Sequence, residues 1–279
     1  MNEKVIIERG ATKSDWRVLD AEGRQVRQFL REGMNVSSMR LEDVRATLRE
    51  GLKAEKLSES KGIFLYTAGV VTDEIRRDLE AAIRAEAPCA EIDIQNDLTG
   101  AARAVCGHES GIAAILGTGS NTCFYDGISV SQKVRSGGFI LGDEGGGAVL
   151  GKLFLADYLK GLVPGPVAKD FESRFDASYA AIVENVYRSH TPAGYLGSLA
   201  PFLLEHRADP YVNALIEKNF RDFIDRALLK YDVAHYPVGI AGGFGWACRD
   251  ILTPLLEKAG IRVSRFVKAP VEGLCEYHK

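Results

Sequence analysis

Three glycine-containing turns in this chain follow apolar segments and have the composition of anion-binding turns. They occupy residues 10–14, 117–121 and 242–245. Because glycine has no Cβ, backbone N–H groups in such turns can approach an anion closely, and Thr and Ser hydroxyls nearby add further donors. One such turn is weak evidence, since glycine is common between strands and helices. Three of them in one chain favour phosphate binding.

The spacing of the glycines disfavours two common classes of nucleotide-binding protein. No turn has the GxxxxGK[ST] spacing of a P-loop, and none has GxGxxG followed by an acidic residue at the next strand end. A Walker-type NTPase and a Rossmann dehydrogenase are therefore both disfavoured.

Asp97 is the candidate for proton transfer. It lies where the apolar segment "EIDIQ" ends and a helical segment begins, so its carboxylate would lie at the carboxyl edge of a sheet and could accept a proton from a hydroxyl group. The alternative is that Asp97 only caps the helix, which is the commoner role of Asp at such a position. Glu144, before a glycine-rich helix start, either supports a site or is a favourable charge in the first helical turn.

The first 107 residues have the periodicity of an α/β sheet covered by helices. The order is three strands, then helix, strand, helix, strand, helix. The expected strands are 4–8, 15–20, 23–30, 62–69 and 90–97, and the expected helices are 41–57, 72–87 and 98–106.

The opening pattern recurs in the second part of the chain. "GATKSDWRVLD" is echoed by "GTGSNTCFYDG", which suggests two copies of one α/β unit, although the match is short. We therefore expect an N-terminal lobe at 1–107 and a C-terminal lobe at 108–279. A helical insertion is expected at about 145–232, and the last helix is a candidate for packing back on the first lobe.

Composition limits the function classes and the location. Of the 279 residues 46% are hydrophobic, and 35 Lys and Arg stand against 38 Asp and Glu, without a sustained basic run, which disfavours nucleic-acid binding. No apolar segment is long enough for a signal peptide or a membrane span, so we expect a cytoplasmic protein without membrane partners. The five cysteines never form CxxC and are expected as reduced thiols, and the five histidines lack the spacing of a zinc site.

A set of motifs resembles one protein family. "ERGATKSDW", "ND" at 96–97, "LGTGSNTCFYDG", "GGFILGDEGGGAVLG" and "VGIAGGFGWACRDIL" are similar to the N-acetylglucosamine kinase branch of the BadF/BadG/BcrA/BcrD ATPases, within the sugar kinase, Hsp70 and actin superfamily. The motifs lie in order from residue 5 to residue 250. The resemblance implies two ribonuclease-H-like (actin-like ATPase) lobes with an interlobe cleft and a helical insertion in the second lobe.

The resemblance also implies roles for individual residues, with ATP and Mg²⁺ as cofactors. Asp97 would be the catalytic base. Sugar contacts would come from Asn35, Thr118, Asn121 and Asp143, although both asparagines could instead be turn residues in the left-handed conformation. The implied nucleotide-binding residues are Gly10, Ala11, Thr12, Lys13, Gly117, Thr118, Gly119, Ser120, Gly242 and Gly243.

Two residues depart from the family pattern. Most relatives have Asp where this chain has Glu8, and Gly or Ser where it has Arg9. Glu8 keeps the charge that would orient Mg²⁺ and adds one methylene, so contact with the metal through water stays open. Arg9 would reach the γ-phosphate, pair with Glu8 or point away. The departures imply either lower activity or a different substrate.

The sequence therefore predicts ATP-dependent phosphorylation of an amino sugar, with N-acetylglucosamine converted to its 6-phosphate as the first choice. The alternatives are an ATPase switch that activates a partner enzyme and a catalytically weakened sugar-binding relative. A small-molecule sugar is the expected partner, and a homodimer stays open.

Overall fold

The computed structural model describes residues 3–9, 13–32, 40–70, 72–88 and 90–279. The chain divides into two compact units. Unit 1 comprises Met1–Ser110, Tyr125–Val130 and Ala269–Lys279, and unit 2 comprises Gly111–Phe124 and Ser131–Lys268.

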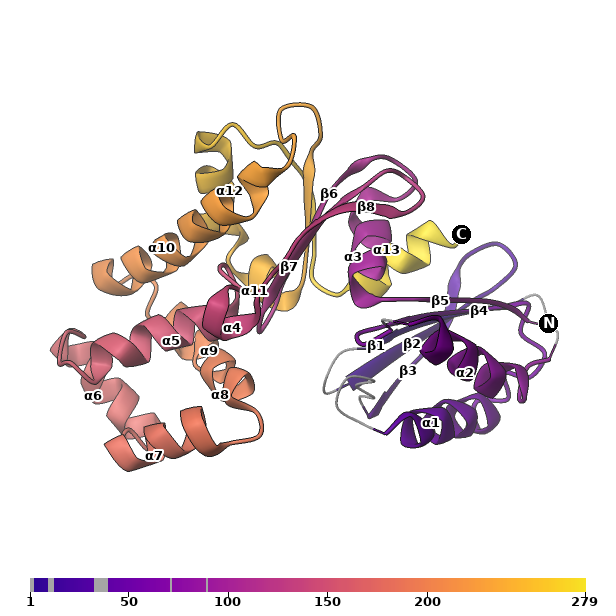
Figure 1. Cartoon of the computed structure of the whole chain (residues 1–279), viewed down its shortest axis with the longest axis horizontal. Helices are drawn as coiled ribbons and strands as arrows, with labels where there is room; N and C mark the ends of the chain where they lie inside the picture. Colours follow the sequence, from indigo (N-terminus) through magenta and orange to yellow (C-terminus); the bar gives the residue numbers. More distant parts are fainter. Residues whose placement is uncertain (1–2, 10–12, 33–39, 71, 89) are drawn as a thin grey trace. The chain divides into compact units, whose positions relative to one another are not determined.

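Unit 1 is built on a five-stranded sheet of order β3-β2-β1-β4-β5 (Figure 1). The central strand β1 pairs antiparallel with β2 and parallel with β4. The strands are β1 (Lys4–Arg9), β2 (Lys13–Leu19), β3 (Gln25–Glu32), β4 (Gly62–Thr67) and β5 (Glu91–Gln95).

Helices cover both faces of this sheet. The helices α1 (Leu41–Ala54) and α2 (Asp73–Arg84) bury one face together with Val5 and Ile7. The helices α3 (Asp97–Cys106) and α13 (Pro270–Tyr277) lie side by side on the other face, which Ile6 shares (Figure 1). A Cβ at Gly273 of α13 would lie 2.2 Å from the Ala104 carbonyl oxygen, so glycine allows this close approach. The last helix of the chain thus belongs to unit 1.

Unit 2 repeats the topology of unit 1. Its sheet has the order β10-β9-β6-β7-β8, in which β6 takes the place of β1, and β6 pairs parallel with β9 as β1 does with β4. The strands are β6 (Gly111–Leu116), β7 (Ser120–Tyr125), β8 (Val130–Val134), β9 (Val238–Ala241) and β10 (Val263–Val267). This identity of strand order agrees with the duplication expected from the sequence.

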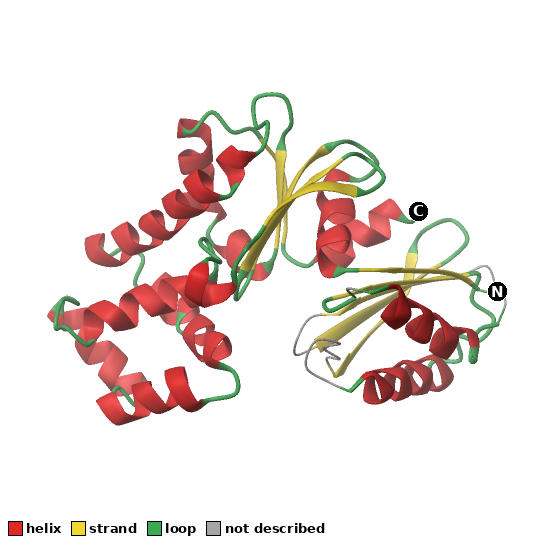
Figure 2. Cartoon of the chain, in the orientation of Figure 1, coloured by secondary structure: helices red, strands yellow, loops and turns green. Residues whose placement is uncertain are grey.

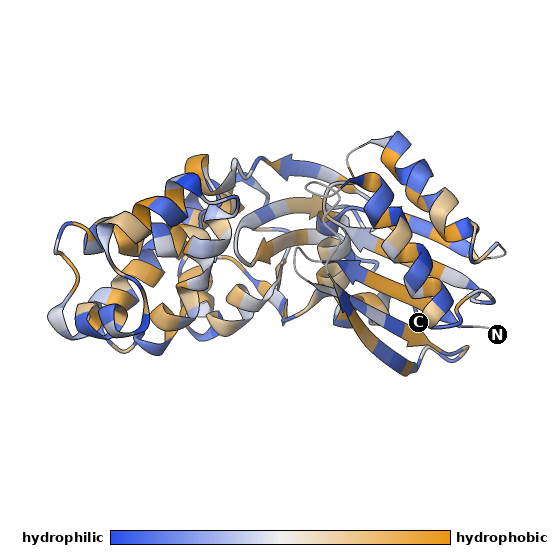
Figure 3. Ribbon diagram, turned by 90° about the horizontal axis from the view of Figure 1, so that it is seen from below, coloured by the Kyte–Doolittle hydropathy of each residue, from blue (hydrophilic) through white to orange (hydrophobic). Residues whose placement is uncertain are grey.

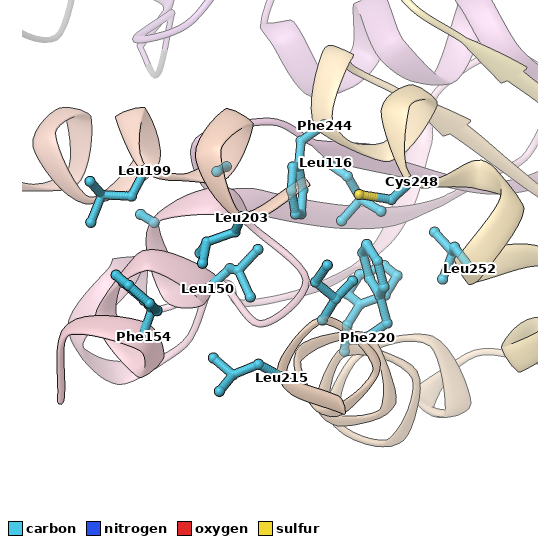
Figure 4. Close-up of a cluster of buried hydrophobic side chains, with 14 of the residues drawn as sticks. Leu116, Leu150, Phe154, Leu199, Leu203, Leu215, Phe220, Phe244, Cys248 and Leu252 are labelled. Carbon is cyan, nitrogen blue, oxygen red and sulfur yellow. The ribbon is translucent and has the colours of Figure 1, made fainter. Parts of the chain in front are cut away.

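A long helical segment lies between β8 and β9 of unit 2 (Figure 2). The side chains of this segment form a core with those of the helices that follow β9. Leu, Phe and Cys side chains of this core pack against the end of β6 (Figure 4). The helices of unit 2 are α4 (Gly138–Leu141), α5 (Gly147–Tyr158), α6 (Gly165–Arg174), α7 (Tyr179–Val183), a π-helical turn (Glu184–Arg188), α8 (Pro192–Ser198), α9 (Ala200–Glu205), α10 (Pro210–Arg226), a 3₁₀ turn (Leu228–Lys230), α11 (Gly243–Ala247) and α12 (Arg249–Lys258).

The fold class predicted from the sequence, an α/β protein of two lobes, is confirmed. Two helix ends were wrong. The helix α1 ends at Ala54 rather than at residue 57, since Lys56 has a φ of 56°, which a helix does not allow, and α2 ends at Arg84 rather than at residue 87. Hydrophobic and hydrophilic residues alternate along the helices, as Figure 3 shows and as packing on a core requires. In the part of the chain that the structure describes, no helix is long and apolar enough to cross a membrane.

Candidate functional site

Three carboxylates gather at the carboxyl end of β1 in unit 1. Glu8 pairs in register with Asp15 of β2, and Asp97 is the first residue of α3. Burial, with the like charges of Asp15 and Asp97, raises the pKa of Glu8 from 4.5 to about 7. A cation bound nearby would favour the ionised form of Glu8, so the cluster is electrostatically suited to a metal ion.

Asp97 is not the cap of α3. The cap is Asn96, whose side-chain Oδ1 accepts a hydrogen bond from the Thr99 N–H at 2.8 Å. The Asp97 carboxylate lies inside the first turn, where its Oδ1 accepts from the Leu98 N–H at 2.9 Å. The alternative interpretation of Asp97 as a capping residue is therefore wrong.

Asp15 differs from the other two carboxylates because Arg17 neutralises it. The Arg17 Nε and Nη2 donate to the two Asp15 oxygens at 2.7 and 2.9 Å. Glu8 and Asp97 are therefore the candidates for metal contact. No group of three or more metal-ligating side chains occurs among the residues that could be searched. Mg²⁺ is commonly held by one or two carboxylates together with water and phosphate oxygens, and this pair fits that arrangement.

Arg9 lies on the opposite face of the sheet from Glu8, because successive side chains of a strand alternate. Its exposed fraction is 1%, and burial lowers the pKa of its guanidinium to about 9. Strand geometry thus favours the expectation that Arg9 points away from Glu8.

Unit 2 contains a cavity of about 470 Å³ at the carboxyl end of β6. It brings together two of the predicted glycine segments, since Gly117, Thr118 and Gly243 all line it. The turn predicted at 242–245 was wrong in extent, because Gly243 is the first residue of α11 and only Gly242 precedes the helix. The other lining residues are Gly147, Gly197, Ala200, Pro201, Leu204, Phe244 and Ala247. Its volume is in the range of small-molecule binding sites.

The glycines that line this cavity and the adjacent Gly242 have two different roles. At Gly117 and Gly243 a Cβ would meet nothing within 4 Å, so their backbones border open space that a ligand could fill. At Gly242, where φ is 118°, a Cβ would lie 2.4 Å from the Leu116 carbonyl oxygen, so only glycine fits. The turn that begins at Gly117 is held against α5 by a hydrogen bond from the Gly147 N–H to the Gly117 carbonyl at 2.9 Å.

The shape and chemistry of the cavity fit a nucleotide. Side chains of Ala200, Pro201 and Leu204 on α9 and of Phe244 and Ala247 on α11 form apolar walls suited to a flat ring. Glycine backbone and the Thr118 hydroxyl lie at one side of these walls and offer donors to phosphate oxygens. Phe244 also packs on Phe220, with ring centroids 5.7 Å apart, which connects the cavity wall to the core (Figure 4).

Asp143 lies beside the same turn. Its backbone is in the left-handed conformation, with a φ of 57°. Burial raises the pKa of its carboxyl, although the Ser120 N–H and the Ser136 side chain hydrogen-bond to it and oppose that shift. Asn121 lies in β7 rather than in a turn, and its Oδ1 accepts from the Thr122 N–H at 3.1 Å. The interpretation of Asn121 as a left-handed turn residue is therefore wrong.

Sequence reasoning missed Asn219 of α10. This side chain is 0% exposed, its Oδ1 accepts from the Gly145 N–H at 2.9 Å, and its Nδ2 donates to the Gly146 carbonyl at 3.1 Å. It therefore fixes the glycine segment that follows Asp143. The sequence signal that could have identified it was a single Asn side chain on the otherwise apolar face of an amphipathic helix. Glu144 forms an ion pair with Arg226 of the same helix, which is consistent with a supporting role.

Some predicted site residues cannot be placed. Gly10, Ala11, Thr12 and Asn35 lie outside the described residues, and Lys13 is described only as the first residue of β2. The four described cysteines are free thiols, and Cys123, Cys248 and Cys275 are buried.

The structure and the sequence are similar to those of known sugar kinases. No protein-family model matches the chain. The structure is similar to that of the putative N-acetylglucosamine kinase from Porphyromonas gingivalis, with a TM-score of 0.92 and 35% sequence identity over 99% of this chain and 98% of that one. A ROK family glucokinase from Streptomyces griseus, solved with glucose and AMPPNP, shares the fold at 17% identity and a TM-score of 0.61, with 99% and 98% of the chains covered.

A curated relative matches part of the chain. The N-acetylmuramic acid/N-acetylglucosamine kinase of Clostridium acetobutylicum is 29% identical over 153 residues, which are 52% of this chain. The matched segment spans 49% of the length of that kinase.

Proposed function

This chain belongs to the same family as the putative N-acetylglucosamine kinase of Porphyromonas gingivalis, and we propose that it transfers the γ-phosphoryl group of ATP to a hydroxyl group of an amino sugar. The observation that carries the proposal is the cavity of unit 2, in which Gly117 and Thr118 of one turn and Gly243 at the start of α11 border one space between apolar walls. N-acetylglucosamine, converted to its 6-phosphate, is the first candidate substrate. The motifs further favour membership of the BadF/BadG/BcrA/BcrD ATPases.

In the proposed reaction, each unit would supply different residues. The cavity of unit 2 would bind the nucleotide, with its base between α9 and α11 and its phosphates toward Gly117 and Thr118. In unit 1, Asp97 would accept the proton of the sugar hydroxyl as its oxygen bonds to the γ-phosphorus and ADP leaves. Bound Mg²⁺ neutralises charge on the phosphates, and Glu8 would hold its water ligands.

The sugar would be held by polar side chains beside the phosphate turn. Asp143 has a partly buried carboxyl suited to accepting hydrogen bonds from sugar hydroxyls, and Asn121 provides both a donor and an acceptor. A buried polar group left without a partner costs about 1 to 3 kcal/mol, so such fixed side chains can select the pattern of hydroxyls on a sugar.

A second function is favoured by Glu8. Because the pKa of Glu8 is raised to about 7, close to half of its population would be protonated at neutral pH before a metal binds. Half protonation would lower the affinity for Mg²⁺ by only about twofold, so the raised pKa alone weakens the site little. The departure from the family pattern at Glu8, where most relatives have Asp, supports a catalytically weakened relative that binds its sugar but transfers phosphate slowly.

The test is ADP release, measured with coupling enzymes across a panel of amino sugars with and without Mg²⁺. Release that requires both a hexosamine and Mg²⁺ supports the kinase. Release without any sugar would indicate an ATPase switch, and sugar binding without release would indicate the weakened relative. The cytoplasmic location and the homodimer stay predictions from sequence.

A further inference from the structure

The walls of the unit 2 cavity lack polar side chains. Of the ten side chains and glycines that line it, all within residues 117–247 that the structure describes, only Thr118 carries a polar side-chain atom. Adenine and guanine differ in the donors and acceptors at their edges. A site that distinguishes them needs a fixed polar partner for those atoms.

The one polar side chain belongs to the phosphate turn and not to the walls. Thr118 is fixed by its backbone, because its carbonyl accepts from the Ala148 N–H of α5 at 2.8 Å. Its methyl group lies against α8, where a Cβ at Gly197 would be 2.9 Å from the Thr118 Cγ2. The Thr118 side chain therefore lies beside Gly197 of α8, and the walls formed by α9 and α11 contribute no polar side chain to the cavity.

The backbone of the walls offers few replacements for these missing partners. Pro201 has no N–H, and the Leu204 carbonyl already accepts from the Arg207 N–H at 3.4 Å. The His206 N–H donates to the Phe202 carbonyl at 3.3 Å, and the Cys248 N–H donates to the Phe244 carbonyl at 3.0 Å.

The charged side chains that follow the walls in the sequence are paired with other residues and exposed. Glu205 pairs with Arg174 and is 59% exposed, and Arg207 pairs with Asp250 at 3.1 Å with exposed fractions of 46% and 56%. Arg249 lies over the Trp246 ring, 4.5 Å from its centroid. Exposed pairs of this kind contribute little energy, and they do not provide a buried partner for a base.

We propose that this cavity binds purine bases through apolar contact alone, so that the enzyme uses ATP, GTP and ITP with little discrimination among the bases. The proposal rests on the proposed function of the cavity as the nucleotide site. An apolar pocket rejects a near-isosteric group by roughly 10²-fold at most, whereas a site with fixed hydrogen-bonding partners reaches about 10⁴- to 10⁵-fold. The expected ratio between any two of these purine nucleotides is therefore below about 10².

The experiment uses the full chain and two independent measurements. Calorimetry gives the dissociation constants of ADP, GDP and IDP, and a coupled assay with N-acetylglucosamine gives kcat/KM for ATP, GTP and ITP. Ratios below about 10² in calorimetry support the proposal, and a larger ratio overturns it. Purine binding with small ratios but without sugar phosphorylation contradicts the kinase function and leaves this inference standing. Sugar phosphorylation that uses ATP but neither GTP nor ITP supports the kinase function and overturns this inference.

A matched pair of variants tests whether the base occupies this cavity. Ala247→Leu fills part of the wall and should weaken ADP, GDP and IDP binding by the same factor, at least about tenfold. Ala180→Leu places the same side chain on an exposed helical position of α7, outside the cavity, and should leave all three unchanged. Unchanged binding in Ala247→Leu, or absence of binding by any purine nucleotide to the wild type, overturns the proposal.

Discussion

The backbone of Gly119 lies directly against the carboxylate of Asp143, such that a Cβ at position 119 would be 2.5 Å from the Asp143 Oδ2. The contact continues at Gly146, where a Cβ would be 2.8 Å from the Gly119 carbonyl carbon. Gly146 therefore leaves room for the backbone of the "GTGSN" segment, and Gly119 leaves room for the end of the Asp143 side chain. This packing sets the position of the Asp143 carboxylate.

Gly119→Ala should lower activity without unfolding the protein. The added methyl group displaces the end of the Asp143 side chain rather than any backbone, so we expect the free energy of unfolding to change by less than about 1 kcal/mol. Loss of a charged hydrogen bond to the sugar is worth about 1.5 to 3 kcal/mol, which predicts a fall of roughly 10- to 100-fold in kcat/KM for the sugar.

The control for this variant is Gly165→Ala, because a Cβ there meets nothing within 4 Å. A double-mutant cycle with Asp143→Ala identifies the cause. If Gly119→Ala acts through the carboxylate, it has little further effect once Asp143 is removed. Full additivity of the two losses would show that Gly119 acts through another contact.

Asp97→Asn should lower kcat by about 10²- to 10⁴-fold, the usual contribution of a positioned base. ADP affinity and the free energy of unfolding should stay near those of the wild type, because Asn96 rather than Asp97 caps α3. Asn96→Ala is the matched control. It should reduce the free energy of unfolding by about 1 kcal/mol and leave most of kcat. A kcat of Asp97→Asn within threefold of the wild type would remove Asp97 from the mechanism.

Glu8→Gln should stabilise the protein at high pH and have little effect at low pH. The pKa of Glu8 is about 7 in the folded protein, against a reference value of 4.5 for the unfolded chain. The folded state therefore holds the proton more tightly. The contribution of Glu8 to stability is therefore present below pH 4.5 and lost as pH rises through 7. At pH 8 the variant should gain on the order of 3 kcal/mol over the wild type.

The measurement is urea unfolding at pH 4.5 and pH 8, followed by tryptophan fluorescence in a Trp246→Phe background. The chain has two tryptophans, so Trp16, which is buried in unit 1, then reports that unit alone. If the free energy of unfolding of Glu8→Gln differed from that of its parent by the same amount at both pH values, the raised pKa would be contradicted.

The strands and the glycine turn at residues 117–119 could be predicted because their signals are local. Alternation in "KVIIER" gives a strand with Glu8 on one face and Arg9 on the other, and glycine after an apolar strand gives a turn. The capping role of Asn96 was not predicted, since Asn96 and Asp97 are both good capping residues and only the backbone conformation decides between them.

The cavity walls and Asn219 could not be predicted, because they depend on contacts between residues far apart in the chain. Ala200, Leu204 and Phe244 have the composition of any helix that packs on a core, and nothing local shows that they border the Gly117 turn. Asn219 holds Gly145 and Gly146 from a helix more than 70 residues away. Such pairings follow from the topology of unit 2 rather than from any single motif.

His278→Phe should make the protein less sensitive to acid. The His278 ring stacks on Phe64, with centroids 3.8 Å apart, and its Nε2 is 2.7 Å from the Tyr66 hydroxyl, which also accepts from Arg103. Burial, with the nearby charges of Arg103 and Lys4, lowers the pKa of His278 from 6.5 to about 3, although Asp93 opposes the shift.

The stability contributed by His278 has a definite pH window. Since its folded pKa lies below 6.5, the contribution is fully present above pH 6.5 and is lost as pH falls through 3. Phenylalanine keeps the ring stacking and does not titrate, so the variant should lose on the order of 3 kcal/mol less than the wild type between pH 6.5 and pH 4. Urea unfolding of both proteins in the Trp246→Phe background measures this difference. Parallel decreases in the free energy of unfolding would mean that His278 does not hold α13 in a pH-dependent way, because only a change in protonation of His278 can separate the two curves.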